Sequence, residues 1–337
     1  MITSVLLKLA HGSTLTQTEQ KSLKQASSAL LLKTARSHVI LIRTHEKLEY
    51  HRPDLYIEWL PQIEEEKQRI QKTLELIEKT QSICQQLNIP CIFTKSFQHY
   101  PDMGHDIDLF VPTRSTAIDE AIQKQLGATP LHNSLLNHIS GKTGYQIPRF
   151  TSPIEIHHGR LGPLGDHVKF ADLLVKRAVL KTFDRTSVLV PSQEDRLVLQ
   201  AVQRVYGHFT LRISDILTSI SLITSPELNL DSGLSTATHI GCRDGFICYL
   251  SAINQASKEA GIFLTLPAWT DFNHSLLITD TAYSFSKRRI STAYLFKYVS
   301  DLQNVRLRSV GLLTLLPFIA VWVLLRNQVN ERRSANN

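Results

Sequence analysis

The strongest indication of the fold is the run Asp106-Ile107-Asp108-Leu109-Phe110-Val111, which Pro112 ends. It follows a turn-rich segment, residues 99–104, and its β-branched and aromatic residues predict a short strand. Side chains alternate along a strand, so Asp106 and Asp108 share one face while Ile107 and Leu109 share the other. We therefore expect a sheet with one apolar face in a core and one face that carries two converging carboxylates.

Two carboxylates on one strand face can hold a hard cation. Mg²⁺ is usually bound by one or two carboxylates and substrate phosphates, because it keeps several of its waters. The preceding Gly104 allows a ligand to approach the backbone closely. Asp106 and Asp108 are therefore candidate ligands of Mg²⁺, with Mn²⁺ as the alternative. A lone Asp-x-Asp also occurs at solvated strand ends, so other residues must support the site.

A third carboxylate lies on a separate predicted strand, Pro153-Ile154-Glu155-Ile156-His157. If this strand neighbours the first, Glu155 joins Asp106 and Asp108. Three carboxylates can hold two metal ions for in-line phosphoryl or nucleotidyl transfer, with Glu155 as a base. The alternative is a solvated glutamate on an edge strand.

Lys95 ends another predicted strand, Cys91-Ile92-Phe93-Thr94, and is followed by Ser96. Its ammonium group can reach a triphosphate oxygen, unless it is an ordinary surface lysine.

Together these residues resemble the uncharacterised bacterial nucleotidyltransferases of the polymerase-β-like superfamily. The resemblance covers about residues 61–224 and rests on the strand that ends in Lys95, the Asp106–Val111 run, and the Glu155–His157 strand. Residues 191–200, 206–208 and 211–216 also resemble the helical segment of that family.

The resemblance implies catalytic and metal-binding roles for Asp106, Asp108 and Glu155, and a phosphate contact for Lys95. Family members tend to have Lys-Gly where this chain has Lys95-Ser96. The Gly-Ser helix start of the wider superfamily is not evident, and Ser96 is the candidate that replaces part of that triphosphate contact.

The implied activity is Mg²⁺-dependent transfer of a nucleoside monophosphate from a nucleoside triphosphate, such as ATP, to an unidentified acceptor. One alternative is a metal-dependent glycosyltransferase, since those enzymes also use Asp-x-Asp. Another is a non-catalytic, membrane-associated partner protein with a degenerate nucleotidyltransferase fold.

The pattern along the chain predicts an α+β fold, in which a small mixed β-sheet core with flanking helices precedes a mostly helical region. A capping box, Thr16 to Glu19, begins a helix that extends to about residue 35, and a second helix follows Pro61. Residues 38–43 fit a strand or a helix. We predict four parts: a helical region (1–60), a nucleotidyltransferase-like core (61–165), a helical domain (166–305) and a basic, apolar tail (306–337).

The net charge of +7 resides in the C-terminal part. From Phe285 onward nine basic residues face two acidic ones, so the rest of the chain is neutral. Composition therefore does not indicate nucleic-acid binding by the core. Residues 309–325 carry no charge, and arginines flank them. They predict a membrane-inserted or membrane-surface tail through residues 306–333, or a hydrophobic helix packed on the body or on a second subunit.

Four cysteines without a disulfide or zinc spacing fit a reducing compartment, and the N-terminus lacks signal-peptide features. We expect a cytoplasmic protein, with membrane binding at the inner face as an added possibility.

Three further motifs have alternative interpretations. One histidine of the His157-His158 pair beside Glu155 could complete a transition-metal site, although a stacking, hydrogen-bonding or surface role is the simpler interpretation. The Gly141-Lys142-Thr143 triplet is similar to the end of a phosphate-binding loop, but Leu136 stands where the first glycine belongs. Arg212 and Asp215 are spaced for an ion pair on one helix face, or for a buried pair near the substrate.

Overall fold

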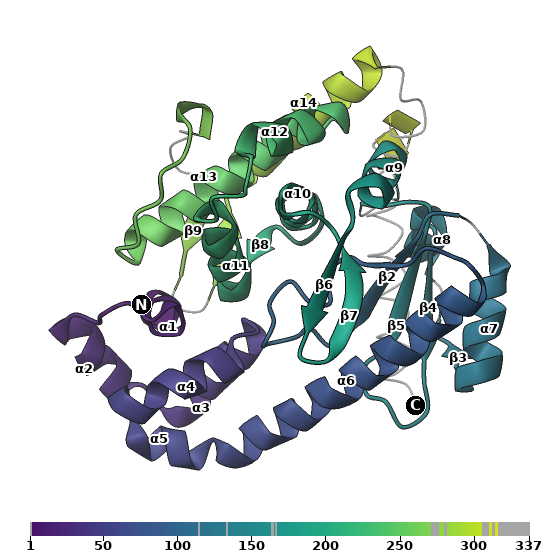
Figure 1. Ribbon diagram of the computed structural model, residues 1–337. Helices are drawn as coiled ribbons and strands as arrows, with labels where there is room; N and C mark the ends of the chain where they lie inside the picture. The colour runs from purple at the N-terminus through teal and green to yellow at the C-terminus, as the bar shows by residue number, and fades with distance from the viewer. Residues whose placement is uncertain are drawn as a thin grey trace, which may run out of the picture.

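A mixed sheet of five strands lies in one half of the molecule and contains the predicted Asp-x-Asp strand (Figure 1). The structure is a computed structural model that describes residues 2–113, 115–132, 134–162, 165, 167–270, 276–279, 282–304, 310–311 and 314–315. In spatial order the strands are β1 (Ile92–Phe93), β2 (Ile107–Val111), β5 (Ile154–His158), β4 (Lys142–Gln146) and β3 (Thr129–Pro130). The β2–β5 pair is parallel and the other pairs are antiparallel, which confirms the predicted mixed sheet.

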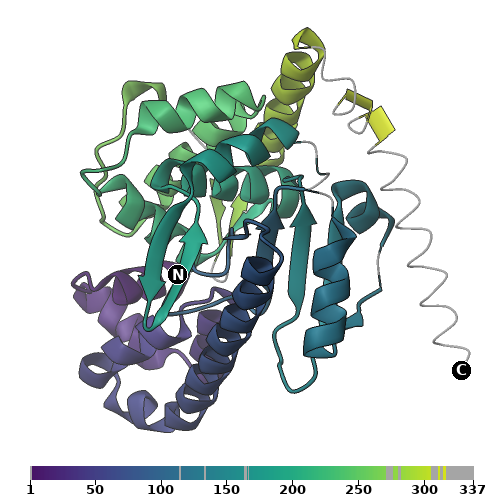
Figure 2. The ribbon, with the colours of Figure 1, turned by 45° about the vertical axis from the view of Figure 1, so that its right-hand side comes forward.

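One face of the sheet is apolar and packs on two helices. The long helix α6 (Leu60–Gln86) crosses this face, and α7 (Thr116–Leu126) lies beside it (Figures 1 and 2). Ile107 and Leu109 are fully buried there, as predicted. Gly127 ends α7 at a φ of 63°, a left-handed conformation that glycine adopts without a steric penalty. The opposite face is therefore the one left for chemistry.

Five helices precede α6: α1 (Ile2–His11), α2 (Gln17–Gln25), α3 (Ser28–Ser37), α4 (Leu41–His51) and α5 (Pro53–Glu58). The capping box at Thr16 is present, but its helix ends at Gln25 because Ala26 is extended and Ser27 caps α3. The single helix predicted to residue 35 is thus two helices. Residues 38–43 form no strand, since α4 begins at Leu41 after a turn.

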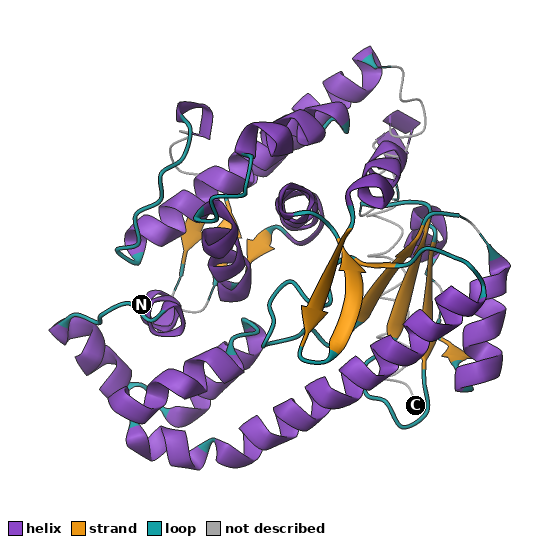
Figure 3. Ribbon diagram, viewed as in Figure 1, coloured by secondary structure: helices purple, strands orange, loops and turns teal. Residues whose placement is uncertain are grey.

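The part after the sheet is mainly helical, as Figure 3 shows, but it also contains strands that the sequence pattern did not predict. The helices are α8 (Leu135–Ser140), which belongs to the sheet unit, and then α9 (Val168–Arg177), α10 (Gln193–Gln203), α11 (Ile213–Ile223), α12 (Leu230–His239), α13 (Arg243–Glu259) and α14 (Lys287–Gln303). A π-helical turn, η1 (Arg204–His208), continues α10, and a 3-10 turn, η2 (Ala268–Thr270), follows α13. A hairpin joins β6 (Val179–Phe183) to β7 (Thr186–Val190), and a second sheet pairs β10 (Tyr283–Phe285) with β8 (Thr210–Leu211) and β9 (Leu276–Ile278).

Two apolar clusters organise the packing. The smaller cluster lies between α6, α7 and the inner face of the sheet, and it includes Val188 of the hairpin. The larger cluster joins the N-terminal helices to α10, α11 and α13, with Phe110 of β2 at its edge. The N-terminal and C-terminal helices therefore lie on the same side of the sheet (Figures 1 and 2).

The predicted membrane-contact segment, residues 306–333, lies outside the described residues apart from 310–311 and 314–315. In the described part of the chain, no helix combines the length and the apolar character needed to span a bilayer. The four cysteines are buried and none forms a disulfide within the described residues.

Candidate active site

Asp108 and Glu155 lie side by side on the two parallel strands. The β2–β5 register pairs them directly, and neighbouring Ile107 and Ile154 point into the apolar core. The predicted neighbourhood of the two strands is therefore present. Asp108 is 3% exposed, whereas Glu155 is half-buried.

Asp106 lies immediately before β2 and is the most exposed of the three carboxylates. The negative charge of Asp108, followed by partial burial, raises the pKa of Asp106 above its usual value. A Cβ on Gly104 would lie 3.4 Å from the Asp106 Oδ1 atom. A side chain at position 104 would therefore crowd this carboxylate.

Lys95 and Ser96 both contact Asp108, although through different atoms. The Lys95 Nζ atom is 2.5 Å from Asp108 Oδ1, and the Ser96 hydroxyl oxygen accepts a hydrogen bond from the Asp108 backbone N–H at 3.0 Å. Burial alone would raise the pKa of Asp108, but Lys95 and His157 outweigh burial and hold it well below its usual value. Asp108 is therefore ionised at neutral pH.

His157 follows Glu155 on the same face of β5. Its Nε2 atom is 3.1 Å from Asp108 Oδ1. Burial lowers the pKa of His157 to about 4, so the ring is neutral at pH 7. Since Asp108 is an acceptor, the neutral ring donates its Nε2–H to it. Ligand atoms of Asp108, Glu155 and His157 all lie within 4.8 Å of one another, close enough to hold a metal ion together.

A cavity of about 220 Å³ opens between this face of the sheet and the end of α10. Its polar lining includes Lys95, Lys142, His157 and His208, and Leu161, Leu199 and Val202 supply apolar walls. His208 lies on the π-helical turn η1, and such turns are frequent at functional sites.

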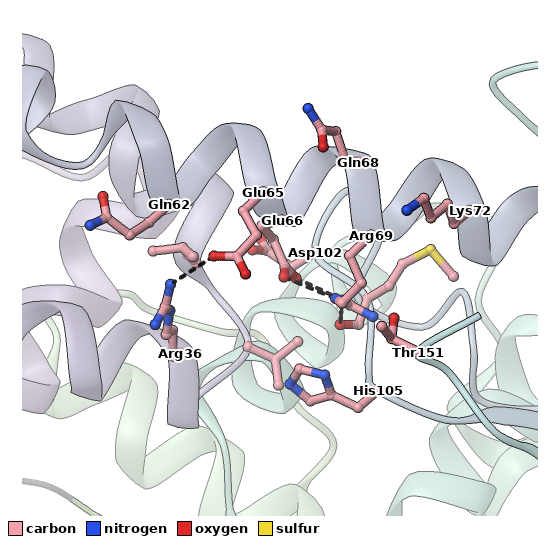
Figure 4. Close-up of a pocket in the computed structure, with 13 residues that line it drawn as sticks. Arg36, Gln62, Glu65, Glu66, Gln68, Arg69, Lys72, Asp102, His105 and Thr151 are labelled. Carbon is pink, nitrogen blue, oxygen red and sulfur yellow. Dashed lines mark hydrogen bonds and ion pairs between the residues drawn. The ribbon is translucent and has the colours of Figure 1, made fainter. Parts of the chain in front are cut away.

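A second, wider cavity of about 670 Å³ lies beside Asp106. Lys33 and Arg36 of α3 and Arg212 line it, so its charged groups apart from Asp106 are cationic. It shares Arg36 and His105 with a cavity of about 450 Å³ between α3 and α6. Figure 4 shows that cavity, with Arg36 directed toward Glu65 and His105 lying below α6. Asp106 therefore faces this wider cavity, whereas Lys95 and His157, the partners of Asp108, face the cavity of about 220 Å³.

Residues 24–256 match the model of a family described as uncharacterised nucleotidyltransferase. This match spans well over half of the chain. The chain belongs to that nucleotidyltransferase family. Family membership favours nucleotidyl transfer over the glycosyltransferase interpretation.

Two further comparisons are less informative. The chain is similar to the solution structure of the antibiotic-resistance factor ANT(2'')-Ia, with 12% identity and a TM-score of 0.31. That alignment covers 56% of this chain and 95% of the other. No curated protein matches the chain.

The charges around the site fit a bound cation. Asp106, Asp108 and Glu155 bring three negative charges, while Lys95 and Lys142 bring two positive charges and His157 is neutral. The excess is negative, and carboxylate oxygen is the donor type that Mg²⁺ and Mn²⁺ prefer. The nitrogen of His157 extends the donor set toward transition metals, so the identity of the metal stays a prediction.

The sequence pattern did not predict the roles that two residues, Lys142 and His157, have in this site. Lys142 lies on β4, opposite His157, and its Nζ atom is 3.1 Å from Glu155 Oε2. The Gly-Lys-Thr motif that contains Lys142 is not a phosphate-binding loop, so the sequence offered only the charge of the lysine as an indication of its role. His157 is the direct partner of Asp108, which its spacing from Glu155 alone does not reveal.

Arg212 and Asp215 do not form the ion pair that their spacing suggests. The Asp215 carboxylate lies 2.8 Å from Arg204 Nε and 3.3 Å from His99 Nε2, and it accepts the backbone N–H of Arg212 at 2.7 Å. Asp215 is thus a buried, paired carboxylate, and the Arg212 side chain instead lines the cavity beside Asp106.

Proposed function

We propose that this chain transfers a nucleoside monophosphate from a nucleoside triphosphate to an acceptor hydroxyl or phosphate, and releases pyrophosphate. The observation that carries the proposal is the direct pairing of Asp108 with Glu155 on the sheet face away from α6 and α7, next to Asp106 and Lys95. Membership in a nucleotidyltransferase family supports it.

Asp106, Asp108 and Glu155 would hold Mg²⁺, or Mn²⁺ in its place. The bound ion supplies Lewis-acid polarisation of the phosphate and charge neutralisation, which three carboxylates cannot supply themselves. His157 donates to Asp108 and fixes the direction of its carboxylate. Ser96 holds the backbone of the same residue in place.

The reacting groups follow from the remaining side chains. An acceptor oxygen attacks the α-phosphorus while the bond from that phosphorus to the pyrophosphate oxygen breaks. Glu155 takes the proton if the acceptor is a hydroxyl. Lys95, which now contacts Asp108, donates to a phosphate oxygen of the triphosphate. Leu161, Leu199 and Val202 keep water from the phosphate cavity.

The test is transfer of label from α-³²P-labelled nucleoside triphosphates to components of a cell extract, together with pyrophosphate release. We expect activity with Mg²⁺ that EDTA removes, and loss of activity in Asp106→Asn and Asp108→Asn. Glu120→Gln is the matched control, because Glu120 is an exposed carboxylate on α7. Equal label transfer by wild type and both aspartate variants would refute the proposal and favour a non-catalytic partner protein.

Thermal stabilisation gives a second, independent readout. A rise in Tm with ATP or GTP that needs Mg²⁺ supports a nucleotide substrate. A protein that no nucleoside triphosphate stabilises would instead match the degenerate-fold alternative.

We also propose a cytoplasmic location, with residues 306–333 at the inner membrane face. The support is the concentration of positive charge around the uncharged residues 309–325. Membrane pelleting that resists carbonate and is lost on deletion of residues 306–337 is the expected result. Release of the full-length protein by carbonate would contradict it. The division at residues 60, 165 and 305 likewise stays a proposal.

A further inference from the structure

A fourth cavity, of about 490 Å³ and lined by cationic side chains, lies beside the loop that follows Lys95. Its walls come from β6, α10, α11, the end of α1 and residues 97–100. The charged or titratable side chains that line it are His11, Arg43, Tyr100, Lys181 and Arg196, and no aspartate or glutamate is among its described lining residues. It shares no lining residue with the cavity at Lys95 and His157.

The two cations at its centre lack carboxylate partners. Within the described residues, Arg196 forms no ion pair, and its recorded hydrogen bond runs from Nη2 to the carbonyl oxygen of Gln98 at 3.3 Å. Burial lowers the pKa of Arg196 to about 10. The pKa of Lys181 is lowered by burial and then by the charge of Arg196, which Glu227 only partly offsets.

Arg43 lines the same cavity but, unlike Arg196, is fully paired within the protein. Its Nη2 atom donates to the carbonyl oxygens of His99 and Tyr100, and its Nε atom is 3.8 Å from Asp102. This guanidinium group is satisfied by the protein. Lys181 lies over the Phe183 ring, 5.9 Å from its centroid, and has no ion pair among the described residues, so its repulsion from Arg196 is one that a bound anion would relieve.

Neutral hydrogen-bonding groups surround the pair. Ser221 and Ser225 bring hydroxyl groups, while the Thr218 hydroxyl donates to the Gln98 carbonyl oxygen and the Gln193 amide donates to Glu227, each at 3.0 Å. The apolar part of the wall lies beside Lys181, where the rings of Phe97 and Phe183 stack with centroids 4.2 Å apart. A guanidinium group, an ammonium group and hydroxyls together are the donor set that phosphate oxygens accept.

We propose that this cavity is a second anion site, separate from the carboxylate cluster, and that it binds a small phosphate-bearing anion between Lys181 and Arg196. The ligand bears at least one phosphate group, as in inorganic phosphate, pyrophosphate or a nucleoside monophosphate. The site does not depend on the proposed transfer reaction, since none of the carboxylates takes part in it.

The experiment is calorimetric titration of the full chain with sodium phosphate, pyrophosphate or AMP, at fixed ionic strength with chloride as the reference anion. We expect Arg196→Gln to weaken phosphate binding about tenfold or more, as when a charged hydrogen bond is lost. Lys181→Gln, on an exposed strand of the hairpin, should act in the same direction. Lys176→Gln, an exposed lysine of α9, is the matched control and should bind as wild type does.

Two further arms separate this site from others. Lys95→Gln should retain the binding that Arg196→Gln loses, because Lys95 lies in the other cavity. In chloride alone, Arg196→Gln should melt at or above the wild-type Tm, and phosphate should raise its Tm less than that of wild type. Stronger binding of AMP than of phosphate identifies a nucleotide; equal binding identifies the phosphate group itself.

Wild-type binding by both Arg196→Gln and Lys181→Gln would overturn the proposal. So would phosphate binding that is no stronger than chloride binding, or that disappears in Lys95→Gln while Arg196→Gln retains it.

Discussion

Asp108 and Asp215 are both buried carboxylates whose pKa lies well below the usual value, and each is held by one cationic side chain and one histidine. Lys95 and His157 hold Asp108, whereas Arg204 and His99 hold Asp215. The direction of the pKa shift alone therefore does not distinguish Asp108 from Asp215.

Their surroundings differ in access and in net charge. The partners of Asp108 line a cavity, and two further carboxylates, Asp106 and Glu155, leave an excess of negative charge. The partners of Asp215, Arg204 and His99, line none of the described cavities, and the positive charges of Arg204 and Arg212 lie near its carboxylate. A shifted pKa therefore marks a functional site here only when an opening and an uncompensated charge accompany it.

The largest expected effect is on stability, at Asp215. Asp215→Asn leaves Arg204, a side chain of the buried π-helical turn, without its counter-charge. Breaking a buried ion pair by removing one partner costs about 3–5 kcal/mol of unfolding free energy. Urea denaturation of both proteins at pH 7 measures this loss.

The pH dependence of the same variant sharpens the comparison. The pKa of Asp215 is lower in the folded chain than in the unfolded chain, where it is about 3.9. Its contribution is therefore present above about pH 4 and is lost as the pH falls through the folded-state pKa. The stability gap between wild type and Asp215→Asn should shrink at acid pH; a constant gap would contradict the assigned pairing.

The next effect is on activity, at Asp108. We expect Asp108→Asn to lower kcat/KM for nucleotidyl transfer by about 10²–10³-fold, the scale seen when one preorganised electrostatic group is removed. Stability should change less than in Asp215→Asn, because Lys95 keeps Asp106 and Glu155 as neighbouring charges. Kinetics and urea denaturation of both variants test the contrast. The comparison fails if Asp215→Asn is the less active protein once each is corrected for its folded fraction.

A smaller effect is expected at Lys95. Lys95→Gln should raise KM for the nucleoside triphosphate about 10–100-fold, because a charged hydrogen bond to phosphate is lost. The same change removes the cation that competes with Mg²⁺ for Asp108. The Mg²⁺ concentration that gives half-maximal activity should therefore not rise. Titrations of nucleotide and of Mg²⁺ separate the two readouts. A parallel rise in both requirements would mean that Lys95 acts on the fold of the site instead.

The local part of this site could be predicted from sequence because strand geometry determines it. A two-residue period places Ile107 and Leu109 in the core and Asp108 on the opposite face, whereas Asp106 lies in a bend just before the strand. The pairing of Asp108 with Glu155 needed the parallel register, which joins residues 47 positions apart and which no local pattern specifies. The two strands could therefore be predicted from the sequence, whereas their position side by side could only be assumed.

The residues that sequence reasoning missed depend on packing between distant elements. Lys142 reaches Glu155 only because β4 lies beside β5, and Arg204 reaches Asp215 because a π-helical turn ends α10. The strands after residue 165 were missed for a related reason. A short run such as Thr186–Val190 forms a strand because it pairs with a hairpin partner. The hydrophobic pattern within that one run does not reveal the partner.

The smallest effect is expected at Lys142, and it tests whether access alone makes a residue functional. Lys142 shares the cavity with Lys95, but its ion pair with Glu155 is partly solvated, and such pairs contribute about 0–1 kcal/mol to stability. Lys142→Gln should therefore leave urea denaturation nearly unchanged. Its transfer rate should fall only a few-fold, because Glu155 loses one weak neighbour and the phosphate cavity keeps Lys95. Lys79→Gln, which removes an exposed pair with Glu75 on α6, is the control for a generic loss of charge. A loss as large as that of Lys95→Gln would make Lys142 a primary phosphate contact, and rates equal to those of Lys79→Gln would confine phosphate recognition to the residues nearest Asp108.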